Sequence, residues 1–319
     1  MKLLLLLITA LLFFQTGKCQ NPGLVMPAFE LLAKYPNIRD FTLSSSGEEG
    51  YFSLQSPLGE ISVISMIRYE NNRWQEPEIV SFSGNYKDTE PFLSPDGLKL
   101  YFASNRPLND SVKEAKDYDI WVVERKDRHQ KWGAPMNLGK PVNTEYNEFY
   151  PSVTLKNNLY FTCDAPGTKG KDDIFFCRWT NNRYEPPVSL SESVNTDGFE
   201  FNSYVSPDES FIIFSGYNRT DGFGSGDLYI SFSDGNQNWC KAANLGEQIN
   251  SKSLDYCPFV DLKTNTLYFT SKRSSIAEVN DFQSITEVVS EIEKYENGFS
   301  RIYKVAFKET FSRLKNVAP

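Results

Sequence analysis

The chain contains the same motif five times, and this repeat limits its possible folds more than any other feature of the sequence. In the clearest copy, Glu90 is followed by Ser94-Pro95-Asp96-Gly97, Tyr101-Phe102-Ala103-Ser104, Asp119-Ile120-Trp121-Val122 and Trp132-x-x-Pro135-x-x-Leu138. Each copy opens with an acidic residue, and successive acids are 50, 58, 52 and 55 residues apart: Asp40, Glu90, Glu148, Glu200 and Asp255. Thirteen residues before each acid stands Pro27, Pro77, Pro135 or Pro187, and in the last copy Ala242. A constant offset inside repeats of unequal length predicts a fixed connection between strands, flanked by loops that tolerate change.

Each copy predicts four short strands. In the second copy the first strand is Pro91 to Ser94, and a tight Ser-Pro-Asp-Gly turn leads to the second strand, Leu98 to Ser104. Asp119 to Arg125 supplies the third strand, and Trp132 to Leu138 supplies the fourth. Five four-stranded units of about 50 to 60 residues are typical of a β-propeller, whereas a β-solenoid has shorter and more even repeats.

The two ends of the repeat region predict how the ring closes. The last copy runs through Tyr303 and Val305 but lacks a Trp-x-x-Pro-x-x-Leu strand, and an unassigned segment, 27–31, stands before the first copy. That segment lies at the usual 13-residue offset from Asp40. We therefore predict an all-β fold: a five-bladed propeller closed by the N-terminal strand, which leaves no long unpaired edge. A sixth blade would need a further copy of the motif.

An insertion in the last copy, at about 280–298, predicts a helix. Ser284 and Glu287 form a capping-box pattern, Asn297-Gly298 suits a helix end, and four apolar residues fall at helical spacing: Ile285, Val288, Val289 and Ile292. We predict about three turns, from near Ile285 to Tyr295, on the rim that carries the variable loops. Either the neighbouring loops or a partner must cover the apolar stripe, and the sequence leaves both possibilities open.

The repeat also resembles a known family. Glu90 to Gly97, Tyr118-Asp119-Ile120-Trp121-Val122 and Asn137-Leu138-Gly139 resemble the TolB-type propeller repeats, relatives of WD repeats, over about residues 23 to 307. The resemblance implies an exported bacterial protein that is not catalytic and that binds a protein or a cell-envelope component. Residues 44–47 and 261–264 depart from Ser-Pro-Asp-Gly, which weakens the resemblance in the first and last copies.

The first nineteen residues predict a secretory signal peptide, followed by one propeller domain at 20–319. Lys2 precedes an apolar block from Leu3 to Phe14, which is too short to span a membrane comfortably. Cys19 suggests a lipid anchor, but Thr16 and Lys18 stand where a bacterial lipobox has Leu and a small residue. We therefore expect ordinary cleavage and an exported protein, periplasmic or extracellular, with no transmembrane segment.

Charge and cysteine content restrict the possible partners. Lys and Arg total 33 against 41 Asp and Glu, which gives a net charge of -8 for the whole chain. Such an acidic chain is not expected to bind nucleic acid or anionic lipid, which require clustered basic residues. Four cysteines follow Cys19, and their spacing matches no metal site: Cys163, Cys177, Cys240 and Cys257. They form either free thiols, which we favour, or disulfides, which an exported protein permits. No cofactor is indicated.

The candidate site is the set of five repeated acids. Strand connectivity predicts that one acid per blade lies near the channel mouth: Asp40, Glu90, Glu148, Glu200 and Asp255. Five converging carboxylates could attract a cation or a basic peptide segment. Alternatively, they serve the fold by pairing with neighbouring blades or with Arg106 and Arg273 at the ends of second strands. Repeated positions more often encode the repeat, so we favour the structural role.

The main alternative to a binding scaffold is a glycoside hydrolase that uses channel-mouth carboxylates. Every acid near the predicted channel is a repeat position, however, so none stands out as an added catalytic group. His129 is the only histidine and falls in a predicted turn, which argues against a Ser-His-Asp triad or a histidine metal site. A calcium-stabilised propeller is a third possibility and would need clustered oxygen ligands. The sequence therefore singles out no catalytic or metal-binding residue.

Overall fold

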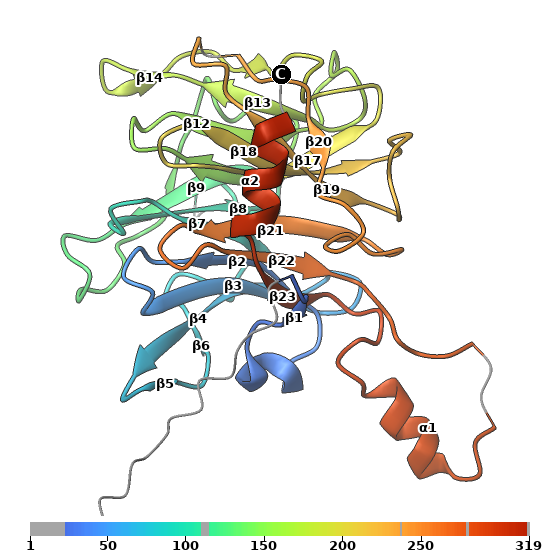
Figure 1. Cartoon of the computed structure of the whole chain (residues 1–319). Coiled ribbons are helices and arrows are strands. Elements are labelled where there is room, and N and C mark those ends of the chain that lie inside the picture. Colours follow the sequence, from blue (N-terminus) through green and yellow to red (C-terminus); the bar gives the residue numbers. More distant parts are fainter. Residues whose placement is uncertain (1–22, 110–114, 237, 279–280, 318–319) are drawn as a thin grey trace, which may run out of the picture.

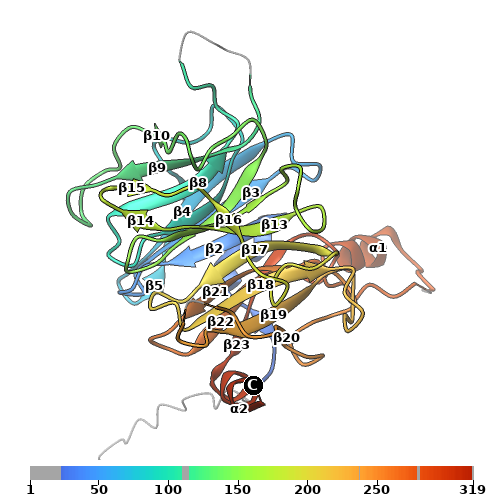
Figure 2. The ribbon, with the colours of Figure 1, turned by 90° about the horizontal axis from the view of Figure 1, so that it is seen from above.

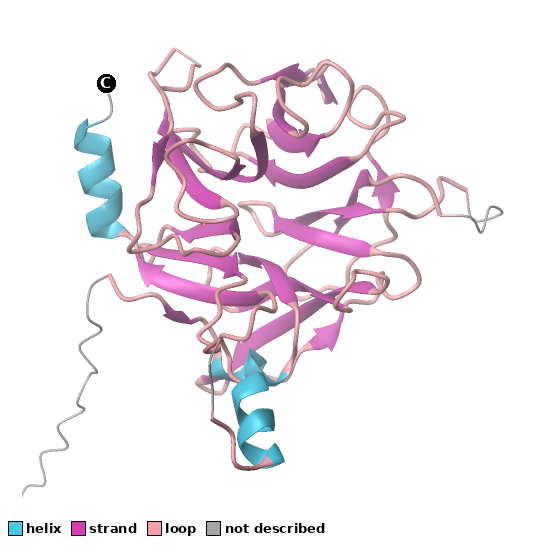
Figure 3. Cartoon of the chain, turned by 90° about the vertical axis from the view of Figure 1, so that its right-hand side faces the viewer, coloured by secondary structure: helices cyan, strands magenta, loops and turns pink. Residues whose placement is uncertain are grey.

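The structure, a computed structural model, describes residues 23–109, 115–236, 238–278 and 281–317. The predicted signal peptide and Cys19 lie outside the described residues. The rest forms five four-stranded antiparallel sheets arranged around a common centre, with two α-helices outside them (Figure 1, Figure 3). The five-bladed propeller predicted from the repeat is thus confirmed.

In blades 1 to 4 the strands follow chain order from the centre outwards. Blade 1 contains β2 (Ile38–Leu43), β3 (Glu49–Gln55), β4 (Ser62–Glu70) and β6 (Glu78–Ile79), with β5 (Arg73–Trp74) also paired to β4. Blade 2 contains β7 (Asp88–Leu93), β8 (Lys99–Ser104), β9 (Asp119–Glu124) and β10 (Met136–Asn137). Blade 3 contains β11 (Glu148–Val153), β12 (Leu159–Cys163), β13 (Asp173–Cys177) and β16 (Val188–Ser189), beside the hairpin of β14 (Trp179–Thr180) and β15 (Arg183–Tyr184). Blade 4 contains β17 (Phe199–Val205), β18 (Phe211–Tyr217), β19 (Asp227–Phe232) and β20 (Ala243–Asn244).

Blade 5 joins the two ends of the chain, as predicted. Its strands β21 (Asp255–Asp261), β22 (Thr266–Ser271) and β23 (Arg301–Ala306) are completed by β1 (Met26–Pro27). Pro27 lies opposite Tyr303 in the antiparallel β1–β23 pair. The predicted strand is shorter than expected, because the chain turns at Phe29 into a 3-10 helix, η1 (Glu30–Lys34). Leu32 of η1 and Phe29 are buried between blades 1 and 5, so closure also contributes apolar packing.

The turn after each first strand tolerates the sequence departures noted above. In blade 2 the Gly97 amide donates to the Ser94 carbonyl over 2.8 Å, and Gly97 has φ 74°. Ser44 and Gly47 make the same bond at 2.8 Å in blade 1, although Pro and Asp are missing there. These two turns share a glycine with positive φ, and the equivalent turns of blades 3 and 4 place Asn157 and Glu209 in the same backbone region at φ 60°.

Aromatic side chains fasten neighbouring blades together. Trp132 of blade 2 packs edge-on against Tyr51 of blade 1 with ring centroids 6.1 Å apart, and Trp239 of blade 4 packs likewise against Tyr160 of blade 3 at 6.2 Å. Tyr51 and Tyr160 occupy equivalent places on their second strands, as the register of the bulged pairs shows. The repeat therefore encodes contacts between blades as well as within them.

The last blade makes this contact with a helix. Its chain continues from β23 into α2 (Lys308–Val317), which lies outside the ring beside β23 (Figure 2). Phe311 of α2 packs against Phe211 and Phe232 of blade 4, at centroid distances of 5.0 and 5.4 Å. The repeat does not predict this helix, because the helix lies beyond the last recognisable repeat strand.

The predicted helix in the fifth-blade insertion is confirmed as α1 (Ile285–Ile292). It ends three residues earlier than expected, with Glu293 as its C-cap. It projects away from the body of the propeller (Figure 1). No helix in the described part of the chain is long and apolar enough to cross a membrane.

The described cysteines form no disulfide, in agreement with the expectation of free thiols. Cys163, Cys177 and Cys257 are buried, and burial raises the pKa of Cys163 and of Cys177 to about 12. Such thiols remain protonated near neutral pH and have little nucleophilic thiolate character.

Candidate functional site

Each innermost strand carries a β-bulge, and the bulged residues meet at the centre of the ring. The register shifts by one residue in all five inner strands. In every bulge the first unpaired residue has a positive φ, between 46° and 62°. We call these five residues the inner ring: Asp40, Glu90, Tyr150, Asn202 and Cys257. Non-glycine residues rarely adopt this backbone, so the strain must be offset by surrounding contacts.

The prediction of one equivalent acid per blade is wrong. Asp40 and Glu90 belong to the inner ring, whereas Glu148, Glu200 and Asp255 lie two residues earlier, at or next to the first residue of their strands. The true equivalent of these three in blade 2 is Asp88, and in blade 1 the position is occupied by Ile38. We call the four acids Asp88, Glu148, Glu200 and Asp255 the entry ring. The sequence contained a signal for the correct register: proline follows the bulged residue in Glu90-Pro91, Tyr150-Pro151 and Cys257-Pro258.

The entry-ring acids are fully buried and hydrogen-bonded. Three of them pair with an arginine that follows the second strand of the same blade. Glu200 pairs with Arg219 at 2.9 Å, and Asp255 pairs with Arg273 at 2.9 Å. The third pair joins Asp88 to Arg106, so Arg106 does not bind Glu90. Arg106 and Arg273 are the predicted partners of rim acids, whereas Arg219 was not predicted.

Glu148 has no arginine partner among the described residues. The Thr144 hydroxyl donates to Glu148 Oε1 at 2.6 Å, and the Thr144 amide donates to Oε2 at 3.2 Å. Burial raises the pKa of Glu148 to about 7, although both Thr144 hydrogen bonds oppose the rise and the Asp119 charge adds to it. Glu148 therefore holds a proton in the folded protein at pH values where an exposed glutamate is ionised.

This raised pKa predicts a pH dependence of stability. Between pH 4.5 and about 7 the folded state binds more protons at Glu148 than the unfolded state, so the free energy of unfolding falls as pH rises through this window. Across this pH window we expect the free energy of unfolding of Glu148→Gln to fall by about 1 to 3 kcal/mol less than that of the wild type. Urea unfolding at several pH values measures it, with exposed Glu192→Gln as the control. An unchanged slope in Glu148→Gln would contradict the assignment.

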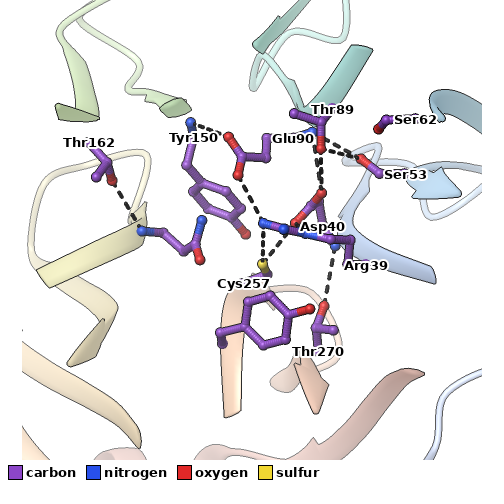
Figure 4. A network of polar contacts seen from close by, with 12 residues as sticks. Arg39, Asp40, Ser53, Ser62, Thr89, Glu90, Tyr150, Thr162, Cys257 and Thr270 are labelled. Carbon is purple, nitrogen blue, oxygen red and sulfur yellow. Dashed lines mark hydrogen bonds and ion pairs between the residues drawn. The ribbon is translucent and has the colours of Figure 1, made fainter. Parts of the chain in front are cut away.

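The inner ring is organised around one cation, Arg39. Its Nε donates to Asp40 Oδ1 at 2.6 Å and its Nη2 donates to Glu90 Oε1 at 2.9 Å (Figure 4). Nη2 also lies 3.6 Å from Cys257 Sγ, and the guanidinium carbon is 5.0 Å from the centre of the Tyr256 ring. One guanidinium thus bridges blades 1, 2 and 5.

The remaining lone pairs of the two inner acids are also occupied. Asp40 accepts from the Cys257 thiol at 2.8 Å and from the Thr89 hydroxyl at 3.2 Å. Glu90 Oε2 accepts from the Tyr150 amide at 2.8 Å, which extends the network to blade 3 (Figure 4). These contacts link adjacent innermost strands across the centre of the ring.

Burial dominates the electrostatics at the centre. It raises the pKa of Glu90 to about 7, with Arg39 opposing the rise and Asp40 adding to it. Burial also acts to lower the pKa of Arg39, but the neighbouring acidic groups, Asp40 first, raise that pKa well above its usual value. Arg39 is therefore permanently charged, and one cation is shared by two buried carboxyl groups.

Four cavities in the described part of the chain are lined by residues other than the predicted acids. One, about 770 Å³, lies between blades 1 and 2 and includes Tyr51, Arg125 and Trp132. A second, about 470 Å³, lies between blades 3 and 4 and includes Tyr160 and Trp239. The third and fourth measure about 170 and 320 Å³. No three His, Cys, Asp or Glu side chains among the described residues are grouped closely enough to hold a metal ion.

The rim on which the inner strands begin also carries α1. Ile285, Val289 and Ile292 of this helix are 78%, 43% and 56% exposed, whereas Val288, the fourth residue of the predicted stripe, is half-buried. Packing over adjacent loops, one of the two possibilities that the sequence left open, therefore covers the stripe only in part.

Comparisons with known proteins support the fold alone. No protein-family model matches the chain, and no curated protein matches its sequence. Among solved structures, a glycoside hydrolase matches with a TM-score of 0.55 at 10% identity, over 88% of this chain and 89% of the other. A GH43 endo-arabinanase from Bacillus licheniformis matches with a TM-score of 0.50 at 12% identity, over 84% and 93%. A putative TolB from Agrobacterium tumefaciens matches with a TM-score of 0.48 at 15% identity, over 77% and 73%. A fold shared at such low identity identifies no activity.

Proposed function

We propose that this protein is an exported, non-catalytic propeller that binds a protein or a cell-envelope component through its loop-rich rim. The observation that carries the proposal is that all five predicted acids are already bound by other side chains of the protein. Asp40 and Glu90 share Arg39, Glu200 and Asp255 pair with arginines, and Glu148 is bound by Thr144. Carboxylates engaged in this way serve the fold, within a blade or between blades, and are poorly placed to receive a substrate.

Binding through the rim is supported by where the chain varies. Four connections between second and third strands, in blades 2 to 5, begin and end on this side, and the one in blade 5 contains the insertion. Loops on a rigid scaffold are where recognition usually resides, since they can change without disturbing the core. Export is proposed from the apolar N-terminal segment at 3–14.

The alternative function, hydrolysis of a glycoside, uses Asp40 and Glu90 as the carboxyl pair. Its support is the presence of two acids at the propeller centre, one of which has a pKa raised to about 7, as a general acid requires. For this function the Arg39 bridge would have to open, because it occupies one oxygen of each acid. We therefore rank hydrolysis second.

Affinity capture tests the proposed function. Envelope extract from a bacterial host is passed over the immobilised full-length protein and over the same protein lacking residues 280–298. We expect a specific partner that binds the intact protein, and no release of reducing sugar from envelope polysaccharides in a parallel assay. Polysaccharide cleavage that Glu90→Gln abolishes would establish the hydrolase instead. Absence of any specific partner would refute the scaffold.

A further inference from the structure

Helix α1 presents three apolar side chains, Ile285, Val289 and Ile292, that the other described parts of the chain leave largely exposed. Ile285, Val289 and Ile292 lie at positions i, i+4 and i+7, the spacing with which a helix places anchors into a groove. Phe282, just before the helix, is 40% exposed as well. The inference drawn from this stripe rests on the proposed function and specifies its partner.

The helix is already formed and held in place without a partner. The Ser284 hydroxyl accepts from the Glu287 amide at 3.2 Å, and the Gln283 amide donates to Glu287 Oε2 at 2.7 Å, which caps the N-terminus. At the other end, the Tyr295 hydroxyl donates to the Ile302 carbonyl of β23 at 2.8 Å. Little ordering entropy is then lost when the stripe binds, because the backbone is organised beforehand.

The charge around the stripe indicates what covers it. Between Ser274 and Phe299 the chain has one basic residue, Lys294, and six acidic residues: Glu278, Asp281, Glu287, Glu291, Glu293 and Glu296. Lys294 is paired with Glu291 at 2.5 Å, so the surplus is negative. A second copy of this chain would bring like charges together, and an eight-residue helix offers little area to offset the repulsion.

We propose that α1 is a docking helix that inserts Ile285, Val289 and Ile292 into an apolar groove of another protein whose rim carries Lys and Arg. The apolar anchors supply affinity, and the acidic surroundings select the partner and speed the encounter. The connection between β22 and β23 contains a helix and thereby gives the rim a recognition element. The described residues of the other four blades contain no such helix.

Two matched variants of the full-length protein test the proposal. Ile285→Gln/Val289→Gln removes the apolar face and keeps good helix formers, whereas Thr286→Gln/Ser290→Gln introduces the same two residues about 100° around the helix, on the neighbouring polar face. Both variants are first shown to unfold at the wild-type urea concentration. The protein captured from envelope extract is then identified and purified, and its affinity for each variant is measured by calorimetry at about 50 and about 300 mM salt.

We expect the apolar-face variant to bind at least about tenfold more weakly, the control to bind like the wild type, and wild-type affinity to fall at high salt. A partner that binds both variants equally would overturn the docking role of α1 and leave the scaffold function intact. Absence of a partner for the wild type would overturn both. Concentration-dependent dimerisation that the apolar-face variant abolishes would identify a second copy as the occupant and overturn the proposed partner.

Discussion

Replacing Arg39 with methionine is expected to lower the free energy of unfolding by about 3 to 5 kcal/mol. Arg39 is the only cation within bonding distance of Asp40 and Glu90 among the described residues, and it bonds them at 2.6 and 2.9 Å. Without it, two carboxyl groups remain buried without a counter-charge, and that cost exceeds the net value of the original pair. Urea unfolding at pH 7.5 measures the change.

The same variant should become more stable as pH falls from about 8 toward 5, because protonation removes the unpaired charges in the folded state. Adding Asp40→Asn and Glu90→Gln to Arg39→Met should recover much of the loss at neutral pH, since a buried neutral network carries no charge penalty. Arg68→Met is the control, because Arg68 and Glu78 form an exposed pair at 3.4 Å that contributes at most about 1 kcal/mol. An Arg39→Met loss as small as that of the control would show that the inner network does not stabilise the ring.

A protein that begins at Asn37 should fail to form a stable monomer. Relative to a protein that begins at Gly23, it lacks β1 and η1, which exposes β23 as a free edge and removes buried Phe29 and Leu32. Loss of two such core side chains costs more than about 5 kcal/mol, which is comparable to the stability of a whole domain. Free edges also promote association.

Size-exclusion chromatography with light scattering and urea unfolding of both proteins test this prediction. Glu30→Ala in the longer protein is the control, because Glu30 lies in η1 with an exposed side chain. We expect aggregation or non-cooperative unfolding only for the protein that begins at Asn37. A monomer with wild-type unfolding would show that the β1–β23 pair does not close the ring.

The fold could be predicted because the repeat records it directly. A periodic motif specifies strands, turns and their order. The unassigned segment around Pro27 predicted the ring closure, which is formed by the pairing of β1 with β23. Helix α1 was foreseen because Ser284 and Glu287 carry an explicit capping signal. Helix α2 was missed, since its packing depends on Phe211 and Phe232 of another blade and no repeat position announces it.

The candidate site was predicted only in part. The constant 13-residue offset suggests that the five acids are equivalent, yet a displacement of two residues along a strand places a side chain in a different ring. The bulges that define the inner ring are backbone features, and of their five residues only Asp40 and Glu90 are acidic. Arg39 was not predicted as a partner of the acids. The repeat indicates basic partners at the ends of second strands, whereas Arg39 lies within the first strand of its blade.

The central claim is that the inner acids maintain the propeller while the rim carries recognition. It is tested most directly with the folded variant Arg39→Met/Asp40→Asn/Glu90→Gln, whose affinity for the captured partner is measured beside that of the wild type. We predict equal affinity, because no described side chain of α1 makes a hydrogen bond or an ion pair with Arg39, Asp40 or Glu90. A correctly folded variant that has lost binding, or that has lost a polysaccharide-cleaving activity present in the wild type, would contradict the claim.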